Sequence, residues 1–221
     1  APLADALLAI TVTESNAGSP DWLHRPGSAF KGPLQMSNAW ARDMKKSPTA
    51  HLLKAVLREQ EALPPNERHP AAQALLDAGI RQSDWKLSVA EPFKNQALVG
   101  AVGIAESAVR VHEVTKKETG EMTAAELWLP HKLGMTGGTM VLDGAYNWPN
   151  NTRLSELRFA HDGHEYPAVR KSAHNGNFKG KYALATPDGI LAQTEAKFAA
   201  KASVAASQLP TDAQAIERVK N

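Results

Sequence analysis

The spacing of apolar side chains predicts a mainly helical chain. Leu3, Leu7 and Ile10 recur at the spacing of one helical face, and similar patterns return along most of the sequence. The pattern predicts helices over residues 3–14, 37–46, 71–78, 95–117, 188–206 and 212–219. Strand signals are weak and lie only near residues 164–170 and 181–185.

Two local signals predict where further helices begin. Ser47-Pro48 combines an N-cap residue with a proline suited to the first helical turn. The helix that follows has an expected apolar stripe made of Leu52, Leu53, Val56 and Leu57. Thr123 and Glu126 form a capping-box pattern, which opens a helix that contains His131.

Composition narrows the classes of protein to which the chain can belong. With 43% hydrophobic and 22% charged residues, the 221-residue chain has the make-up of a folded globular protein. The formal net charge is only +2, which falls short of the concentrated Lys/Arg patch of proteins that bind nucleic acid. Cysteine is absent, so disulfides, a catalytic thiolate and Cys-ligated zinc are excluded. We expect no membrane insertion, because no apolar run reaches about 18 residues, and residues 1–5 lack the pattern of a signal peptide.

Glu14 is the first candidate for chemistry. It lies four residues after Ile10 and seven after Leu7, on the apolar face of its helix and next to a loop rich in Gly and Pro. Burial and the negative end of the helix dipole should both raise the pKa of its carboxyl group. A carboxylic acid that keeps its proton near neutral pH suits the general acid of a glycosidase. The alternative is a glutamate that ends a helix and points to water.

Two segments resemble a family of glycan-cleaving enzymes. Glu14-Ser15 at a helix end, followed after a loop by the segment Gly32–Met36, resembles the signature of lytic transglycosylases and their lysozyme-like relatives. The segment Thr123–Gly134 is similar to one in phage-type transglycosylase domains. The resemblance implies a lysozyme-like fold, mainly α with at most a small β element. It also implies that Glu14 acts as general acid in cleaving the glycan strands of peptidoglycan.

Several polar and aromatic side chains are candidates for binding the substrate. The six that we select are Ser15, Asp21, Gly32, Gln35, His131 and Tyr146. Gln35 carries a donor and an acceptor for sugar hydroxyls or an N-acetyl group, and Gly32 would let the backbone approach a sugar closely. Tyr146, with Trp22 and Trp148, offers a ring that can stack on a sugar face. The alternative for each is a structural role, as a hydrogen bond that orders a loop or as packing in the core.

The mechanism depends on whether a second carboxylate faces the cleft. Inverting hydrolysis needs a base that activates water, and retaining hydrolysis commonly needs a nucleophile. Asp21 lies seven residues after Glu14, and Asp143 and Asp162 are more distant options. Without such a partner, the resemblance implies that one Glu serves as acid and then as base and leaves a 1,6-anhydro sugar. Cleavage by a muramidase or a glucosaminidase is the hydrolytic alternative.

The resemblance also suggests how the chain is divided. The segments that contain Glu14 and His131 are further apart than the family implies, so we expect an insertion around residues 45–95. A lysozyme-like catalytic domain is then expected over residues 1–146. Residues 147–221 are expected to form a loop-rich and then helical extension that packs on the same domain.

A cluster of metal-ligand types needs separate consideration. His161, Asp162, His164 and Glu165 lie close together in sequence, with His174 beyond them. Their spacing does not match a standard zinc signature such as His-Glu-x-x-His. A polar surface loop is the interpretation that we favour, so we expect neither a metal nor another cofactor.

The wider role follows from the resemblance and from what the sequence lacks. Compact wall-cutting domains serve phage entry or lysis, the assembly of secretion machines, and attack on other bacteria by type VI secretion. We favour an antibacterial effector that is secreted or delivered to the periplasm. Such a toxin implies an immunity protein that occludes the cleft. The rival interpretations are a non-catalytic glycan-binding or assembly protein with a lysozyme-like cleft, and a structural helical domain in which Glu14-Ser15 is a coincidence.

Overall fold

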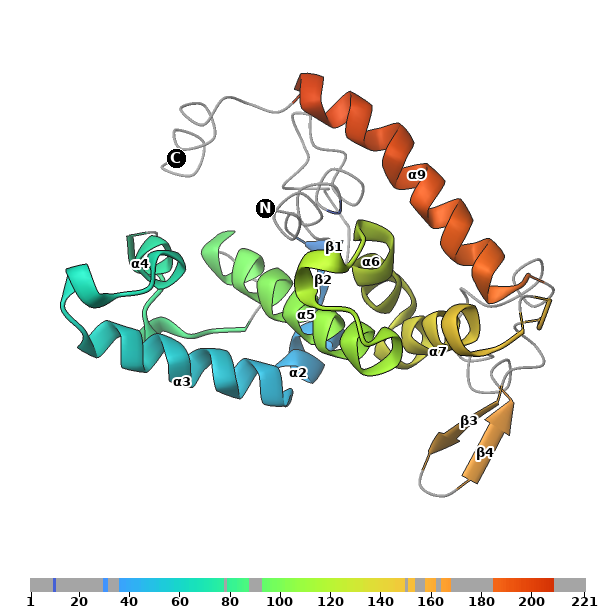
Figure 1. Cartoon of the computed structure of the whole chain (residues 1–221). Coiled ribbons are helices and arrows are strands. Elements are labelled where there is room, and N and C mark those ends of the chain that lie inside the picture. Colours follow the sequence, from blue (N-terminus) through green and yellow to red (C-terminus); the bar gives the residue numbers. More distant parts are fainter. Residues whose placement is uncertain are drawn as a thin grey trace. The chain divides into compact units, whose positions relative to one another are not determined.

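The computed structural model of the chain is mainly helical, as the apolar spacing predicts (Figure 1). It describes residues 10, 30–31, 36–77, 79–87, 93–149, 151–153, 158–161, 164–167 and 185–208. These residues belong to two compact units. The first unit contains the described residues from Phe30 to Glu106, and the second contains Ile10 and those from Ser107 to Ser207. None of the described helices is long and apolar enough to cross a membrane.

The first unit consists of a short hairpin followed by helices. Its elements are β1 (Phe30–Lys31), β2 (Met36–Ser37), α2 (Asn38–Met44), α3 (Pro48–Ala62), η1 (Pro65–Glu67), α4 (Pro70–Asp77), η2 (Gln82–Asp84) and the first part of α5 (Phe93–Thr115). The two strands pair antiparallel, with Phe30 opposite Ser37 and Lys31 opposite Met36. The sequence predicts the α-helices of this unit closely, whereas it gives no signal for the hairpin or for the two 3-10 helices.

Both serine signals for a helix start are confirmed. The Ser37 hydroxyl accepts a hydrogen bond from the Trp40 amide at 3.1 Å and caps α2. The Ser47 hydroxyl accepts one from the Ala50 amide at 3.1 Å and caps α3, in which Pro48 is the first residue. Each serine satisfies an amide that has no partner within the first turn of its helix.

The apolar stripe expected on α3 is partly wrong. Ala50 and Leu57 are buried, but Leu52 and Val56 are 64% and 44% exposed. Ala50, Leu53 and Leu57 are spaced by three, four and seven residues and therefore share one face. Leu52 and Val56 are one turn apart on a different face of α3, so burial of Ala50 turns them towards solvent.

Hydrogen bonds join the start of α3 to α5 within the first unit. The Glu106 carboxylate is buried and accepts from Ser47 Oγ at 3.0 Å and from Thr49 Oγ1 at 2.6 Å. Gly103, one turn earlier on α5, faces α2. A Cβ atom on Gly103 would lie 2.7 Å from Nε1 of Trp40, so glycine allows this close approach.

Among its described residues, the second unit contains the end of α5, one short 3-10 helix, three α-helices and two strands. These are η3 (Thr119–Glu121), α6 (Ala124–Leu133), α7 (Met135–Asn147), β3 (Arg158–His161), β4 (His164–Pro167) and α9 (Pro187–Gln208). Strands β3 and β4 pair antiparallel, with His161 opposite His164. Strand β4 falls within the expected strand signal at 164–170, and α9 confirms the helix expected at 188–206.

Helix α7 is an α-helix that the sequence does not predict. Its segment contains Gly137, Gly138 and Gly144, and glycine weakens helix formation. Helices α6 and α7 pack against each other. A Cβ atom on Gly138 would lie 2.3 Å from Cα of Pro130, so the two backbones meet where a larger residue cannot fit.

Helix α9 packs on α6 through aromatic and cationic side chains. The rings of Trp128 and Phe198 meet edge to face, with centroids 5.7 Å apart and planes at 80°. Lys197 Nζ lies 4.5 Å from the centroid of the Trp128 ring, and Lys132 Nζ lies 5.7 Å from it. Both Trp128 and Phe198 are buried.

Candidate functional site

Five of the residues expected at the site lie outside the described residues. They are Glu14, Ser15, Asp21, Gly32 and Gln35. Trp22, Asp162, His174, the expected helix at 212–219 and most of the strand signal at 181–185 also lie outside them. Ile10 is described as helical and completely buried, which agrees with the apolar face expected for residues 3–14. Strands β1 and β2 bring together the residues on either side of 32–35.

The segment Thr123–Gly134 forms one helix with a defined start and end. The Thr123 hydroxyl accepts from the Glu126 amide at 3.2 Å, and the Glu126 carboxylate accepts from the Thr123 amide at 2.7 Å. This reciprocal pair is the capping box that the sequence predicts. Gly134 ends the helix with φ of +79°, a conformation that side-chain-bearing residues rarely adopt.

Glu126 is also the centre of a buried cluster of polar side chains. Its side chain is 0% exposed, and Oε1 accepts from Lys117 Nζ at 2.6 Å and from the Tyr146 hydroxyl. Lys117 Nζ also donates to the Tyr146 oxygen at 2.9 Å. We call Lys117, Glu126 and Tyr146 the Glu126 cluster. It joins the segment after α5 to α6 and α7.

The cluster holds its three groups in their ordinary charge states. Burial alone would raise the pKa of Glu126, but hydrogen bonds from Lys117, Tyr146 and the Thr123 amide outweigh burial and bring the pKa below 4.5. Burial would lower the pKa of Lys117, but its bonds to Glu126 and Tyr146 raise it above 10.5. Burial and the bond to Glu126 raise the pKa of Tyr146 above 10.0, despite the opposing effect of Lys117.

These properties make Glu126 a structural residue. A general acid must reach the leaving oxygen and keep its proton near neutral pH. Glu126 is shielded from solvent, its carboxylate accepts three hydrogen bonds, and its pKa is lowered. The sequence predicts Glu126 as a cap but does not identify its partner Lys117. The signal available was a capping-box glutamate at the start of an otherwise apolar helix.

Tyr146 belongs to the same cluster, and its ring lies at the surface. Its side chain is 39% exposed, and Lys117 Nζ lies 5.0 Å from the ring centroid. Lys117 Nζ is also 2.9 Å from the Tyr146 oxygen, so the cation lies near the hydroxyl end of the ring and not over its centre. The hydroxyl is engaged by Glu126 and Lys117.

The other described candidates lie on α6 and at the end of α7. His131 is partly buried in the last turn of α6, and its Nδ1 atom is shielded from solvent. The Asp143 carboxylate accepts from Asn147 Nδ2 at 2.9 Å and from the Trp148 indole at 3.1 Å. Asp143 therefore orders the end of α7, and Trp148 is held by it.

The described residues offer no ready metal site. No group of three or more His, Asp or Glu side chains within the described ranges is arranged to hold a metal ion. His161 and His164 are backbone partners in the register of the β3–β4 pair. In comparisons with known proteins, no family model, curated protein or solved structure matches the chain.

Proposed function

We propose that the chain cleaves the glycan strands of bacterial peptidoglycan, with Glu14 as general acid. The observation that carries this proposal is the segment Thr123–Gly134. This segment resembles one in phage-type transglycosylase domains, and it forms a single helix that Thr123 caps and Gly134 ends. A capped helix followed by a glycine turn is what the resemblance implies for one wall of the cleft.

The start of the chain supports the same proposal. In lytic transglycosylases the catalytic Glu-Ser is followed by a loop and then by a segment that leads into the next helix. Here the strands β1 and β2 flank residues 32–35, and Ser37 then caps α2. A small β element within a mainly α chain is compatible with a lysozyme-like fold.

The proposed chemistry places the first proton transfer on Glu14. Its carboxylic acid protonates the leaving sugar oxygen as the glycosidic bond breaks. The same carboxylate then acts as base, either towards water or towards the sugar hydroxyl that closes a 1,6-anhydro ring. Asp21 is the candidate for a second carboxylate, because Asp143 is already bonded to Asn147 and Trp148.

Digestion of purified sacculi tests the proposal. Mass spectrometry of the released muropeptides should show anhydro ends for a transglycosylase, or reducing muramic acid or glucosamine ends for a hydrolase. Glu14→Gln should abolish release while circular dichroism stays unchanged. Glu59→Gln is the matched control, because Glu59 is exposed on α3, and it should retain activity.

Two outcomes contradict the proposal. A folded Glu14→Gln protein that still releases muropeptides removes Glu14 from the mechanism. A wild-type protein that sediments with sacculi and leaves them intact favours the non-catalytic glycan-binding alternative. The proposed role as a periplasmic effector with an immunity protein depends on activity and is tested by co-purification of a dedicated inhibitor.

A further inference from the structure

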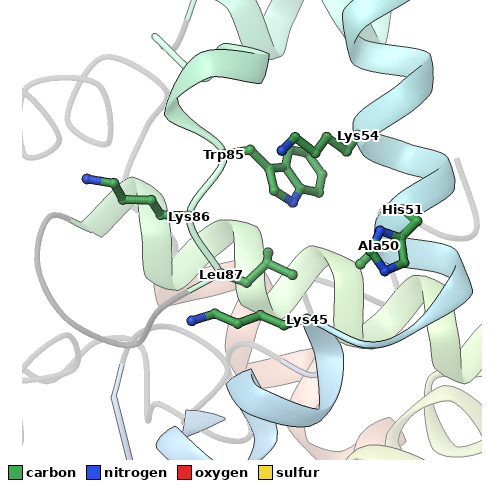
Figure 2. Close-up of a pocket in the computed structure, with 7 residues that line it drawn as sticks. All are labelled: Lys45, Ala50, His51, Lys54, Trp85, Lys86 and Leu87. Carbon is green, nitrogen blue, oxygen red and sulfur yellow. The ribbon is translucent and has the colours of Figure 1, made fainter.

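The first unit contains a cavity with a strongly basic lining. The cavity has a volume of about 340 Å³ and lies between the end of α2, the first turns of α3 and the segment after η2 (Figure 2). Its basic side chains are Lys45, His51, Lys54 and Lys86. None of the described residues that line it is acidic. Three lysines therefore gather at one cavity in a chain whose formal net charge is only +2.

The remainder of the lining is apolar or aromatic. Ala50 and Leu87 are buried, and Trp85 is half-buried with its indole at the cavity. In Figure 2, Lys45 and Lys54 lie to either side of Leu87 and Trp85, whereas the amino group of Lys86 points away from them. A ligand in this cavity would contact the apolar side chains of Ala50 and Leu87, the indole of Trp85 and the surrounding lysines.

The cavity walls are held in place by hydrogen bonds that Glu61 on α3 accepts. The Glu61 carboxylate accepts from the Gln82 amide at 3.1 Å and pairs with Arg81 at 3.4 Å. The Trp85 amide then donates to the Gln82 carbonyl at 3.3 Å. These bonds connect the segment that contains Trp85 to the helix that contains Lys54. The two walls of the cavity are therefore fixed relative to each other.

The lysines of the lining have no carboxylate partner among the described residues. Lys45, Lys54 and Lys86 make no ion pair with any described Asp or Glu side chain. Like charges gathered around one cavity repel each other and attract an anion. The volume is near the lower end of the range for small-molecule sites, about 300–1,000 Å³. The cavity thus suits a small anionic ligand with apolar groups.

We propose that this cavity binds the acidic stem peptide of peptidoglycan, an inference that rests on the proposed function. Stem peptides carry free carboxylates next to small methyl groups. The carboxylates would pair with Lys45 and Lys54, and the methyl groups would contact Leu87 and Trp85. Binding of the peptide would hold a glycan strand on the enzyme independently of the residues that cut it.

The test is isothermal titration of the full chain with synthetic N-acetyl-L-alanyl-γ-D-glutamyl-L-lysine, a net-anionic tripeptide in which the acetyl group replaces the amide link to the sugar. The free-acid peptide should bind, and a peptide with both carboxylates amidated should bind at least about tenfold more weakly. Lys45→Gln combined with Lys54→Gln should weaken binding by about tenfold or more. Lys46→Gln is the matched control, because Lys46 is exposed beside Lys45 but does not line the cavity.

Inorganic phosphate and the intact sacculus complete the test. Peptide binding that phosphate displaces at equal concentration, or that survives amidation, overturns the proposal. Equal weakening by Lys46→Gln and the double variant also overturns it. The double variant should digest sacculi more slowly than wild type but should digest peptide-free glycan strands at an unchanged rate.

The failure of this inference is distinguishable from the failure of the proposed function. The tripeptide contains no glycosidic bond, so its binding does not depend on cleavage. If sacculi are cut and the tripeptide does not bind, the peptide site is wrong and the enzyme stands. If the tripeptide binds through Lys45 and Lys54 and sacculi remain intact, the peptide site stands and cleavage is wrong.

Discussion

Lys117 Nζ lies 2.6 Å from Oε1 of Glu126, whose side chain is completely shielded from solvent. The lysine side chain itself remains 29% exposed, so the pair is half open to water. A buried carboxylate without a partner is costly, because folding removes its hydration. The bond from Lys117 therefore makes it possible for Glu126 to cap α6 in its charged form.

Removal of the lysine charge should destabilise the second unit. Lys117→Met keeps most of the aliphatic stem and should lower the free energy of unfolding by about 2 kcal/mol. Lys116→Met is the control, because Lys116 is exposed and, among the described residues, its Nζ donates only to the Glu113 carbonyl. Urea denaturation of the three proteins measures the difference. Equal effects of the two substitutions would show that the pair contributes nothing specific.

The lowered pKa of Glu126 predicts a loss of stability in acid. Glu126 binds a proton less readily in the folded than in the unfolded chain, so its contribution is complete above about pH 4.5. The contribution is lost as the pH falls through the folded-state pKa. Urea denaturation between pH 7 and pH 3 should show that Glu126→Gln loses less stability than wild type. Parallel pH curves for the two proteins would contradict the prediction.

The contact between Gly138 and Pro130 predicts a large effect of one methyl group. Gly138→Ala would place Cβ 2.3 Å from backbone atoms of Pro130, which forces α6 and α7 apart. We expect the free energy of unfolding to fall by about 2–3 kcal/mol. Gly120→Ala is the control, since no atom lies within 4 Å of a Cβ at that position. Thermal unfolding that is unchanged in Gly138→Ala would mean that the helices do not meet there.

Ser47 should matter more than Ser37, although both cap a helix. Ser37→Ala removes one cap and should cost about 1 kcal/mol. Ser47→Ala removes a cap and also a donor to the buried carboxylate of Glu106, so it should cost about 2 kcal/mol. Denaturation of the two variants side by side gives the comparison. If Ser47→Ala lowers the free energy of unfolding no more than Ser37→Ala does, the bond to Glu106 does not contribute to stability.

Local chemistry explains which elements could be predicted from the sequence. The sequence predicts the starts of α2, α3 and α6 because Ser37, Ser47 and Thr123 each accept from an amide three residues away. Helix α7 was missed because its glycines signal a break, while their real cause is the close approach of α6. The need for glycine comes from α6, which lies outside this segment, and it becomes visible only when the packing of the two helices is known.

In the candidate site too, the local contacts could be predicted from the sequence and the distant ones could not. Glu126 was found as a cap, because Thr123 is three residues away, but Lys117 and Tyr146 were not linked to it. Those contacts span 9 and 20 residues and depend on how α5, α6 and α7 pack. The apolar stripe predicted for α3 is partly wrong for a related reason. The stripe correctly includes Leu57, but the spacing of leucine and valine does not show that Ala50 faces the core in place of Leu52 and Val56.

The packing of α9 on Trp128 gives the protein a built-in optical reporter. Trp128 is one of five tryptophans, and its indole is only 7% exposed beneath Phe198 and the Lys197 ammonium group. Any event that lifts α9 must admit water to this ring and shift its emission to longer wavelength. A chain in which the other four tryptophans are phenylalanine would follow that movement in real time, without an added dye.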